Sequence, residues 1–123
     1  MPMALILFVD DDTYTLETLT KAAEVLGHQA VVADSYQAAL LLLGETLPDL
    51  IFTDMNLTGE NGISLVQALK ARSSTAGIPV IILSASPEVA TAEVAQAAGA
   101  LAYLNKPVRL TTLQEVIRVY TTH

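Results

Sequence analysis

The residues best suited to chemistry are polar side chains that directly follow short apolar runs. Asp10-Asp11-Asp12 follows the first apolar run, and Asp54 follows Leu50-Ile51-Phe52-Thr53. Ser84 and Lys106 follow two later runs in the same way. Carboxylate oxygens bind Mg²⁺, lysine and magnesium neutralise phosphate oxygens, and a hydroxyl donates a hydrogen bond to them. These residue types therefore favour the transfer of a phosphoryl group.

Asp54 is the candidate acceptor of that group. An aspartate carboxylate can attack phosphorus and form an aspartyl phosphate. Asp54 stands apart from the other acidic residues and precedes the turn-rich stretch Met55 to Gly62, so it is free to point at an incoming group. The adjacent acids of Asp10-Asp11-Asp12 are better suited to hold the metal ion, because clustered carboxylates repel one another unless a cation lies among them.

Each of these residues also has a simple structural interpretation. Asp12 or Thr13 could cap a helix, Ser84 could begin a turn, and Lys106 could be a surface lysine. Asp34 is a further acidic residue at the end of an apolar run. For any one residue alone the structural interpretation is favoured. It does not explain why carboxylates, a hydroxyl and an ammonium group would converge on one place.

These side chains can meet only if the apolar runs are parallel strands of one sheet. Apolar runs of four to six residues alternate with longer segments of helical period, which is typical of a parallel sheet with helices on both faces. The carboxyl ends of such strands share one edge, where ligands bind in this class of fold. The predicted strands are Ala4 to Val9, Gln29 to Ala33, Leu50 to Thr53, Val80 to Leu83 and Leu101 to Leu104. The predicted helices are Thr13 to Leu26, a helix capped by Asp34 or Ser35 and ended by Gly44, Ile63 to Arg72, Pro87 to Ala98, and Arg109 to Tyr120.

Length and composition limit the class of protein. At 123 residues the chain has the length of one domain that builds its own hydrophobic core. It has no cysteine, and thirteen acidic against six basic residues give a formal charge of -7. This charge argues against binding to nucleic acid or to an anionic membrane, and no apolar stretch approaches the roughly 18 residues needed to cross a bilayer. We therefore expect one soluble domain over residues 1–123, with the cytoplasm as its compartment.

Two of the predicted helices have unusual faces. Leu40-Leu41-Leu42-Leu43 covers most of the circumference of its helix at about 100° per residue, so at least one leucine must face outward. That leucine is either a scattered exposed residue or part of a small docking patch. The segment Pro87 to Ala98 is rich in alanine and has a thin apolar face. Because it buries little area, we expect this helix to move most easily.

The chain resembles the receiver domain of two-component response regulators, the CheY-like phosphoacceptor module. The likeness covers essentially the whole length and lies in five segments at the spacing of the family. They are Leu7 to Asp12, Pro48 to Asp54, Asn61-Gly62, Val80 to Ala85 and Tyr103 to Pro107. The resemblance implies a flavodoxin-like α/β fold of five βα units, with a doubly wound five-stranded parallel sheet in the strand order 2-1-3-4-5.

The resemblance also assigns the acceptor and the metal site. It implies that Asp54 is the phosphoacceptor and binds Mg²⁺ together with Asp11 and the backbone carbonyl of Asn56. Asp10 would act on the ion mainly through a bound water. Lys106 would pair with Asp54 before phosphorylation and with the phosphoryl group afterwards.

Ser84 and Tyr103 correspond to the switch residues of the family. Ser84 would contact the phosphoryl oxygens, and Tyr103 would turn inward when Ser84 moves. The alternative for Tyr103 is a half-buried tyrosine of an edge strand, without a switching role. The Lys106-Pro107 bond matches the cis peptide of the family, which proline makes accessible.

A few positions depart from the common family pattern or vary within it. Thr58 stands where the family often has proline, so the loop after the acceptor has one constraint fewer. Ser84 replaces the commoner threonine but keeps the hydroxyl, so switching should survive. Asn56 and Ser86 occupy the two variable positions that flank the path of the attacking water.

The function implied by the resemblance is a phosphorylation-dependent signalling switch. The phosphoryl donor would be a sensor histidine kinase or a histidine phosphotransfer protein, and the signal would pass to a downstream protein target or effector domain. Phosphorylation would change the surface formed by the helix after Ser84, the strand of Tyr103 and the last helix. The same surface is a candidate for pairing two copies of the chain. Such a domain is not classed as an enzyme, although it supports its own phosphorylation and dephosphorylation.

Two other interpretations stay open at this point. Asp10-Asp11-Asp12-Thr13 satisfies the Asp-x-Asp-x-Thr signature of haloacid-dehalogenase-like phosphatases, in which the first aspartate is the nucleophile. That family needs a later acidic pair for Mg²⁺, whereas only Glu115, inside a predicted helix, follows Lys106, and Asp54 would have no role. The other alternative is a receiver-shaped interaction module that is not regulated by phosphorylation.

Overall fold

The structure, a computed structural model, describes residues 3–57, 60–85 and 89–121, and it places the side chains of all of these except 89–91. In this part of the chain five parallel strands form one sheet in the order β2-β1-β3-β4-β5, so the predicted order is confirmed. The strands are β1 (Leu5–Val9), β2 (Gln29–Ala33), β3 (Leu50–Asp54), β4 (Val80–Ser84) and β5 (Ala102–Asn105). The helices are α1 (Thr13–Val25), α2 (Tyr36–Leu43), α3 (Gly62–Lys70), α4 (Val89–Ala98) and α5 (Leu110–Thr121).

The strand boundaries differ from the predicted ones where the site is built. Asp54 and Ser84 are the last residues of β3 and β4, not the first residues after them. The strands extend this far because their neighbours still offer partners: Asp54 pairs with Leu83, and Ser84 pairs with Asn105. α3 ends at Lys70 instead of Arg72. The predicted start of α4 at Pro87 lies outside the described residues.

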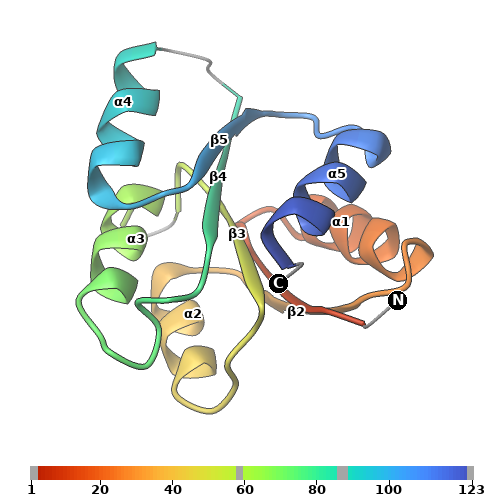
Figure 1. Cartoon of the computed structure of the whole chain (residues 1–123), viewed down its shortest axis with the longest axis horizontal. Coiled ribbons are helices and arrows are strands. Elements are labelled where there is room, and N and C mark those ends of the chain that lie inside the picture. Colours follow the sequence, from red (N-terminus) through yellow and green to blue (C-terminus); the bar gives the residue numbers. More distant parts are fainter. Residues whose placement is uncertain (1–2, 58–59, 86–88, 122–123) are drawn as a thin grey trace.

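The helices cover both faces of the sheet (Figure 1). On one face α1 and α5 pack on a core that includes Phe8 and Phe52, with ring centroids 5.4 Å apart. On the other face α2, α3 and α4 pack on a core that includes Leu7, Ile51 and Ile82. Consecutive residues of a strand point to opposite faces, so residues 50–52 of β3 and 80–83 of β4 are continuous apolar runs. This arrangement leaves the amino and carboxyl ends of the strands for polar side chains.

Side-chain caps fix where three of the helices begin. Asp12 accepts a hydrogen bond from the Thr15 N–H at the start of α1, and Ser35 accepts one from the Ala38 N–H at the start of α2. Asn61 caps α3 in the same way. These caps satisfy backbone donors that have no partner within the helix. All three helices begin at the carboxyl edge of the sheet.

The surface predictions are partly tested. Leu41 is 75% exposed whereas Leu43 is buried, which confirms that one leucine of the run faces outward. A docking role for it stays a prediction. Among the described side chains of α4, only Ala95 is fully buried, which confirms the thin apolar face of that helix. Of the helices in the described ranges, none is both long and apolar enough to span a membrane.

Candidate functional site

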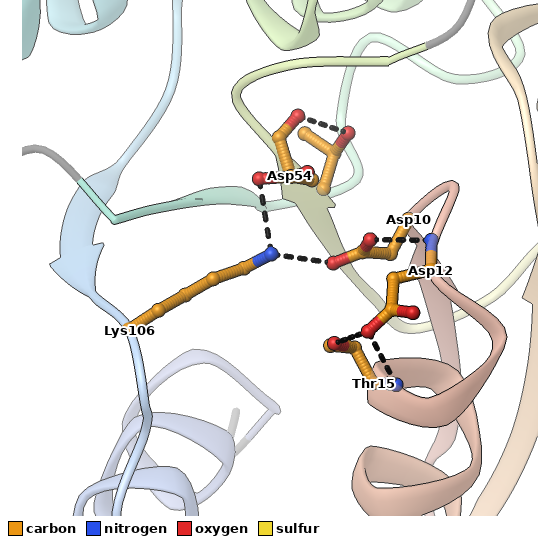
Figure 2. Close-up of polar contacts among 6 residues, drawn as sticks. Asp10, Asp12, Thr15, Asp54 and Lys106 are labelled. Atoms are coloured by element: carbon orange, nitrogen blue, oxygen red, sulfur yellow. Dashed lines mark hydrogen bonds and ion pairs between the residues drawn. The ribbon is translucent and has the colours of Figure 1, made fainter.

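Lys106 lies between two carboxylates at the carboxyl edge of the sheet (Figure 2). Its Nζ donates a hydrogen bond to Oδ2 of Asp10 at 2.6 Å and lies 3.1 Å from Oδ1 of Asp54. Asp10 follows β1, Asp54 ends β3 and Lys106 follows β5. The contact with Asp54 that the resemblance implied is present. The nearer partner is Asp10, and nothing in the sequence pointed to that.

Backbone hydrogen bonds between neighbouring strands hold these positions. The Asp10 N–H donates to the Ala33 carbonyl at 3.1 Å, and the Lys106 N–H donates to the Ser84 carbonyl at 2.8 Å. Directly after Asp54, the Met55 N–H donates to the Leu83 carbonyl at 2.9 Å. The sheet ladder therefore continues into the residues that carry the functional side chains. The Lys106-Pro107 peptide is cis, as predicted.

Electrostatics at the site leave a net negative charge. Burial raises the pKa of Asp54, and the charge of Asp10 raises it further, against hydrogen bonds from Lys106 and the Asn56 backbone N–H. For Lys106, burial alone would lower the pKa, but hydrogen bonds to Asp10 and Asp54 outweigh it and the pKa is raised. A carboxylate beside lysine usually has a lowered pKa. Asp54 differs because it is buried and because two carboxylates share one ammonium group.

Three carboxylates could hold a cation. Oxygen atoms of Asp10, Asp11 and Asp54 all lie within 4.8 Å of one another. Asp11 is exposed, whereas the side chains of Asp10 and Asp54 are 3% and 12% exposed, so the cluster opens to solvent on one side. Hard oxygen donors of this kind suit Mg²⁺. The donor set and its excess negative charge fit the ion that the resemblance implies.

The other acidic residues at this edge lie outside the cluster. Asp12 caps α1 and accepts a hydrogen bond from the Thr15 hydroxyl at 2.6 Å. This bond holds the pKa of Asp12 below its usual value. Asp34 is exposed and is not among the carboxylates that converge. The structural interpretation is therefore confirmed for Asp12 as a helix cap, and Thr13 is the first residue of the helix.

The loop after Asp54 contains a feature that the sequence reasoning missed. The Gly62 N–H donates to the Met55 carbonyl at 2.7 Å, so the loop turns back to the end of β3. A Cβ atom at Gly62 would overlap the carbonyl oxygen of Asp54 and lie 3.2 Å from the Met55 Cα. Only glycine fits this close approach. The Asn-Gly dipeptide at 61–62 was the available signal, but its distance from the acceptor in sequence hid its role.

The remaining predicted site residues are placed as follows. Ser84 is 3% exposed at the end of β4, next to the backbone of Lys106. Asn56 is exposed in the loop after β3. Tyr103 is half-buried in the edge strand β5 and packs on the core that contains Ile82, a position compatible with both of its interpretations. Thr58 and Ser86 lie outside the described residues.

Comparison with known proteins decides the family. Residues 6–118 match the response regulator receiver domain. The chain belongs to the response regulator receiver family. This receiver domain is 33% identical over 115 residues to the protein PilH of Pseudomonas aeruginosa, covering 94% of the chain and 95% of PilH. It is also 37% identical over 102 residues to the phosphate regulon transcriptional regulatory protein PhoB of Escherichia coli. That match covers 83% of the chain but only 44% of PhoB.

Solved structures agree with this family. A response regulator receiver domain from Clostridium thermocellum superposes with a TM-score of 0.89 at 28% identity, covering 97% of this chain and 94% of that one. The chemotaxis response regulator CheY4 of Vibrio cholerae gives a TM-score of 0.90 at 24% identity, covering 97% and 99% of the two chains. The second match shows the shared fold. The receiver domain described here is thus a signalling module of two-component systems.

Proposed function

We propose that this receiver domain accepts a phosphoryl group on Asp54 in the presence of Mg²⁺ and acts as a phosphorylation-dependent switch in the cytoplasm. The donor is a phosphohistidine on a sensor histidine kinase or a histidine phosphotransfer protein. One observation carries the proposal. The Asp54 carboxylate shares the Lys106 ammonium group with Asp10, in a cluster of oxygens from three carboxylates that lie within 4.8 Å of one another.

The chain supplies an acceptor and the groups that neutralise the transferred charge. An Oδ atom of Asp54 attacks phosphorus while the P–N bond to histidine breaks, and the electron pair stays on the imidazole nitrogen, which takes up a proton. Lys106 is placed to leave Asp54 for a phosphoryl oxygen, and the Ser84 hydroxyl donates to another. Bound Mg²⁺, held by Asp10, Asp11, Asp54 and the Asn56 carbonyl, would neutralise charge on the phosphoryl oxygens.

The output is a change in the surface formed by α4, β5 and α5. Contacts made only with the phosphoryl group shift the population towards one of two arrangements. Ser84 and Lys106 lie at the two adjacent strand ends that lead to α4 and α5, and Tyr103 pairs with Ile82 further back along the same two strands. Val94 of α4 and Leu110 of α5 are 54% and 46% exposed, and Leu101, just before β5, is 51% exposed. They offer apolar area to a downstream protein, an effector domain or a second copy of the chain.

The acceptor assignment predicts the loss of phosphorylation in Asp54→Asn. Incubation of wild-type protein with acetyl phosphate and Mg²⁺ should give one labelled aspartate, and Asp54→Asn should give none, because an amide is not a nucleophile towards phosphorus. Mass spectrometry of the intact protein and of its peptides measures the label. Asp34→Asn is the matched control, since it removes an exposed carboxylate that lies outside the cluster.

Three outcomes contradict the proposal in different ways. Full labelling of Asp54→Asn would exclude Asp54 as the acceptor. Label on Asp10 in the wild type would favour the phosphatase-like chemistry of the Asp10-Asp11-Asp12-Thr13 motif. Absence of label from the folded wild type would favour an interaction module that works without phosphorylation.

A further inference from the structure

The short loop after β3 is anchored by two buried apolar side chains, one on each side of Asn56. Asn56 is exposed, but Met55 and Leu57 on either side of it are each only 8% exposed. Both belong to the core cluster that also contains Leu65 and Val66 of α3. A shift of the Asn56 backbone away from Asp54 would therefore pull one of two apolar side chains out of the core.

Hydrogen bonds within the described part of the loop close it on itself. The Leu57 N–H donates to the Glu60 carbonyl at 3.1 Å, and Asn56 and Asn61 form an isolated antiparallel bridge. The Asn56 backbone N–H lowers the pKa of the Asp54 carboxyl against the effect of burial, so it lies close to that side chain. One end of the loop is thus near the acceptor side chain. The other end contacts the Asp54 backbone through Gly62.

We propose that Leu57 and Gly62 are positioning residues that set the affinity of the site for Mg²⁺. Neither residue would itself be a ligand of the ion. Leu57 fixes the Asn56 peptide by keeping its own side chain in the core, and Gly62 permits the loop to approach the Asp54 backbone. Residues that orient metal ligands in this indirect way commonly change metal affinity about 10–100-fold when they are altered. This inference rests on the proposed Mg²⁺ site and adds the residues that shape it.

The test compares two buried leucines of the same core cluster. Leu57 is 8% exposed beside the site, and Leu43 is 4% exposed at the last turn of α2, away from the carboxyl edge of the sheet. Isothermal titration calorimetry with MgCl₂ gives the dissociation constant of wild type, Leu57→Ala and Leu43→Ala, and urea unfolding gives the stability of each. We expect Leu57→Ala to weaken Mg²⁺ binding about tenfold or more. Leu43→Ala should lower stability and leave Mg²⁺ affinity at the wild-type value.

Further variants separate positioning from general loss of structure. Leu57→Val is the milder substitution if Leu57→Ala does not fold, and Leu57→Met should restore most of the affinity because it refills the core. Gly62→Ala should weaken Mg²⁺ binding further, since its Cβ overlaps the Asp54 carbonyl. Gly77→Ala is the matched control, because a Cβ there meets nothing within 4 Å.

Two results would overturn the inference. Equal Mg²⁺ affinity in wild type and in the folded Leu57 variants would show that the loop position does not depend on this side chain. Equal losses in the Leu57 and Leu43 variants of similar stability would show a general effect of core stability. A folded wild type that binds no Mg²⁺ would overturn the proposed function together with this inference.

Discussion

Two half-buried lysines lie at opposite edges of the sheet and have different partners. Lys106 follows β5 at the carboxyl edge and faces two carboxylates. Lys70 is the last residue of α3, and its Nζ donates to the carbonyl oxygens of Ala76 and Ile78 at 3.0 and 2.9 Å, just before β4. Burial lowers the pKa of Lys70, whereas the carboxylates raise that of Lys106 in spite of its burial. The same side chain fastens a loop at one edge and neutralises charge at the other.

The difference shows which lysine can respond to a ligand. Lys70 has neutral partners that belong to the backbone, and its Cγ lies so close to Gly99 that a Cβ there would approach it to 2.9 Å. It therefore joins the end of α3 to the end of α4 as a fixed part of the fold. Lys106 has charged partners, the carboxylates of Asp10 and Asp54. Of the two lysines, Lys106 is the one that the proposed function requires to change partners.

The largest expected effect is that of Lys106→Met on stability in the absence of Mg²⁺. The substitution leaves Asp10 and Asp54 facing each other without a cation. Removing one member of a buried ion pair costs about 3–5 kcal/mol, and the partial exposure of Lys106 reduces this to about 2 kcal/mol. Urea unfolding measures the difference. Saturating Mg²⁺ should recover most of it, because the ion binds the folded carboxylates. A loss that Mg²⁺ does not change would place Lys106 in the same structural class as Lys70.

A smaller effect is expected for Lys70→Met. Methionine keeps the apolar stem against Gly99 and removes the ammonium group, so two carbonyl oxygens lose a donor. Because Ala76 and Ile78 are only partly buried, the cost should be about 1 kcal/mol by urea unfolding. Acetyl phosphate labelling and Mg²⁺ affinity should equal those of the wild type. A change in either would show that the far edge of the sheet is coupled to the site.

The smallest expected effect is a difference in pH dependence above neutrality. The raised pKa of Lys106 means that the folded state holds this proton more tightly. Its contribution to stability is therefore complete below the unfolded pKa of about 10.4 and is lost as pH rises through the folded value. The lowered pKa of Lys70 has the opposite sign, so stability gains from that group as pH rises through its folded pKa towards about 10.4.

Urea unfolding of each lysine-to-methionine variant is compared with that of the wild type from pH 8 to about pH 11. The difference in stability isolates the contribution of the lysine that the variant lacks. The destabilisation caused by Lys106→Met should shrink at the alkaline end. The destabilisation caused by Lys70→Met should grow as pH approaches that range. If the destabilisation changed with pH in the same way in both variants, the two lysines would share one electrostatic environment.

Much of the fold follows from local patterns in the sequence. Buried parallel strands read as continuous apolar runs, and Ser35 and Gly44 mark the two ends of a helix, so the elements were predictable to within a few residues. The strand order came from the family resemblance and is confirmed by the sheet. The exact ends of β3 and β4 were not predictable. They depend on whether a neighbouring strand still offers a hydrogen-bond partner, as Leu83 does for Asp54.

The candidate site, like the fold, was predictable from the sequence only in part. The sequence by itself determined that carboxylates, a hydroxyl and a lysine lie at or near the carboxyl ends of strands that share an edge, because side-chain chemistry and strand period are local properties. Only the tertiary structure decided that Lys106 lies nearer to Asp10 than to Asp54, and that Leu57 is buried. Those outcomes depend on strand register and on core packing between residues far apart in the chain, which no local pattern records.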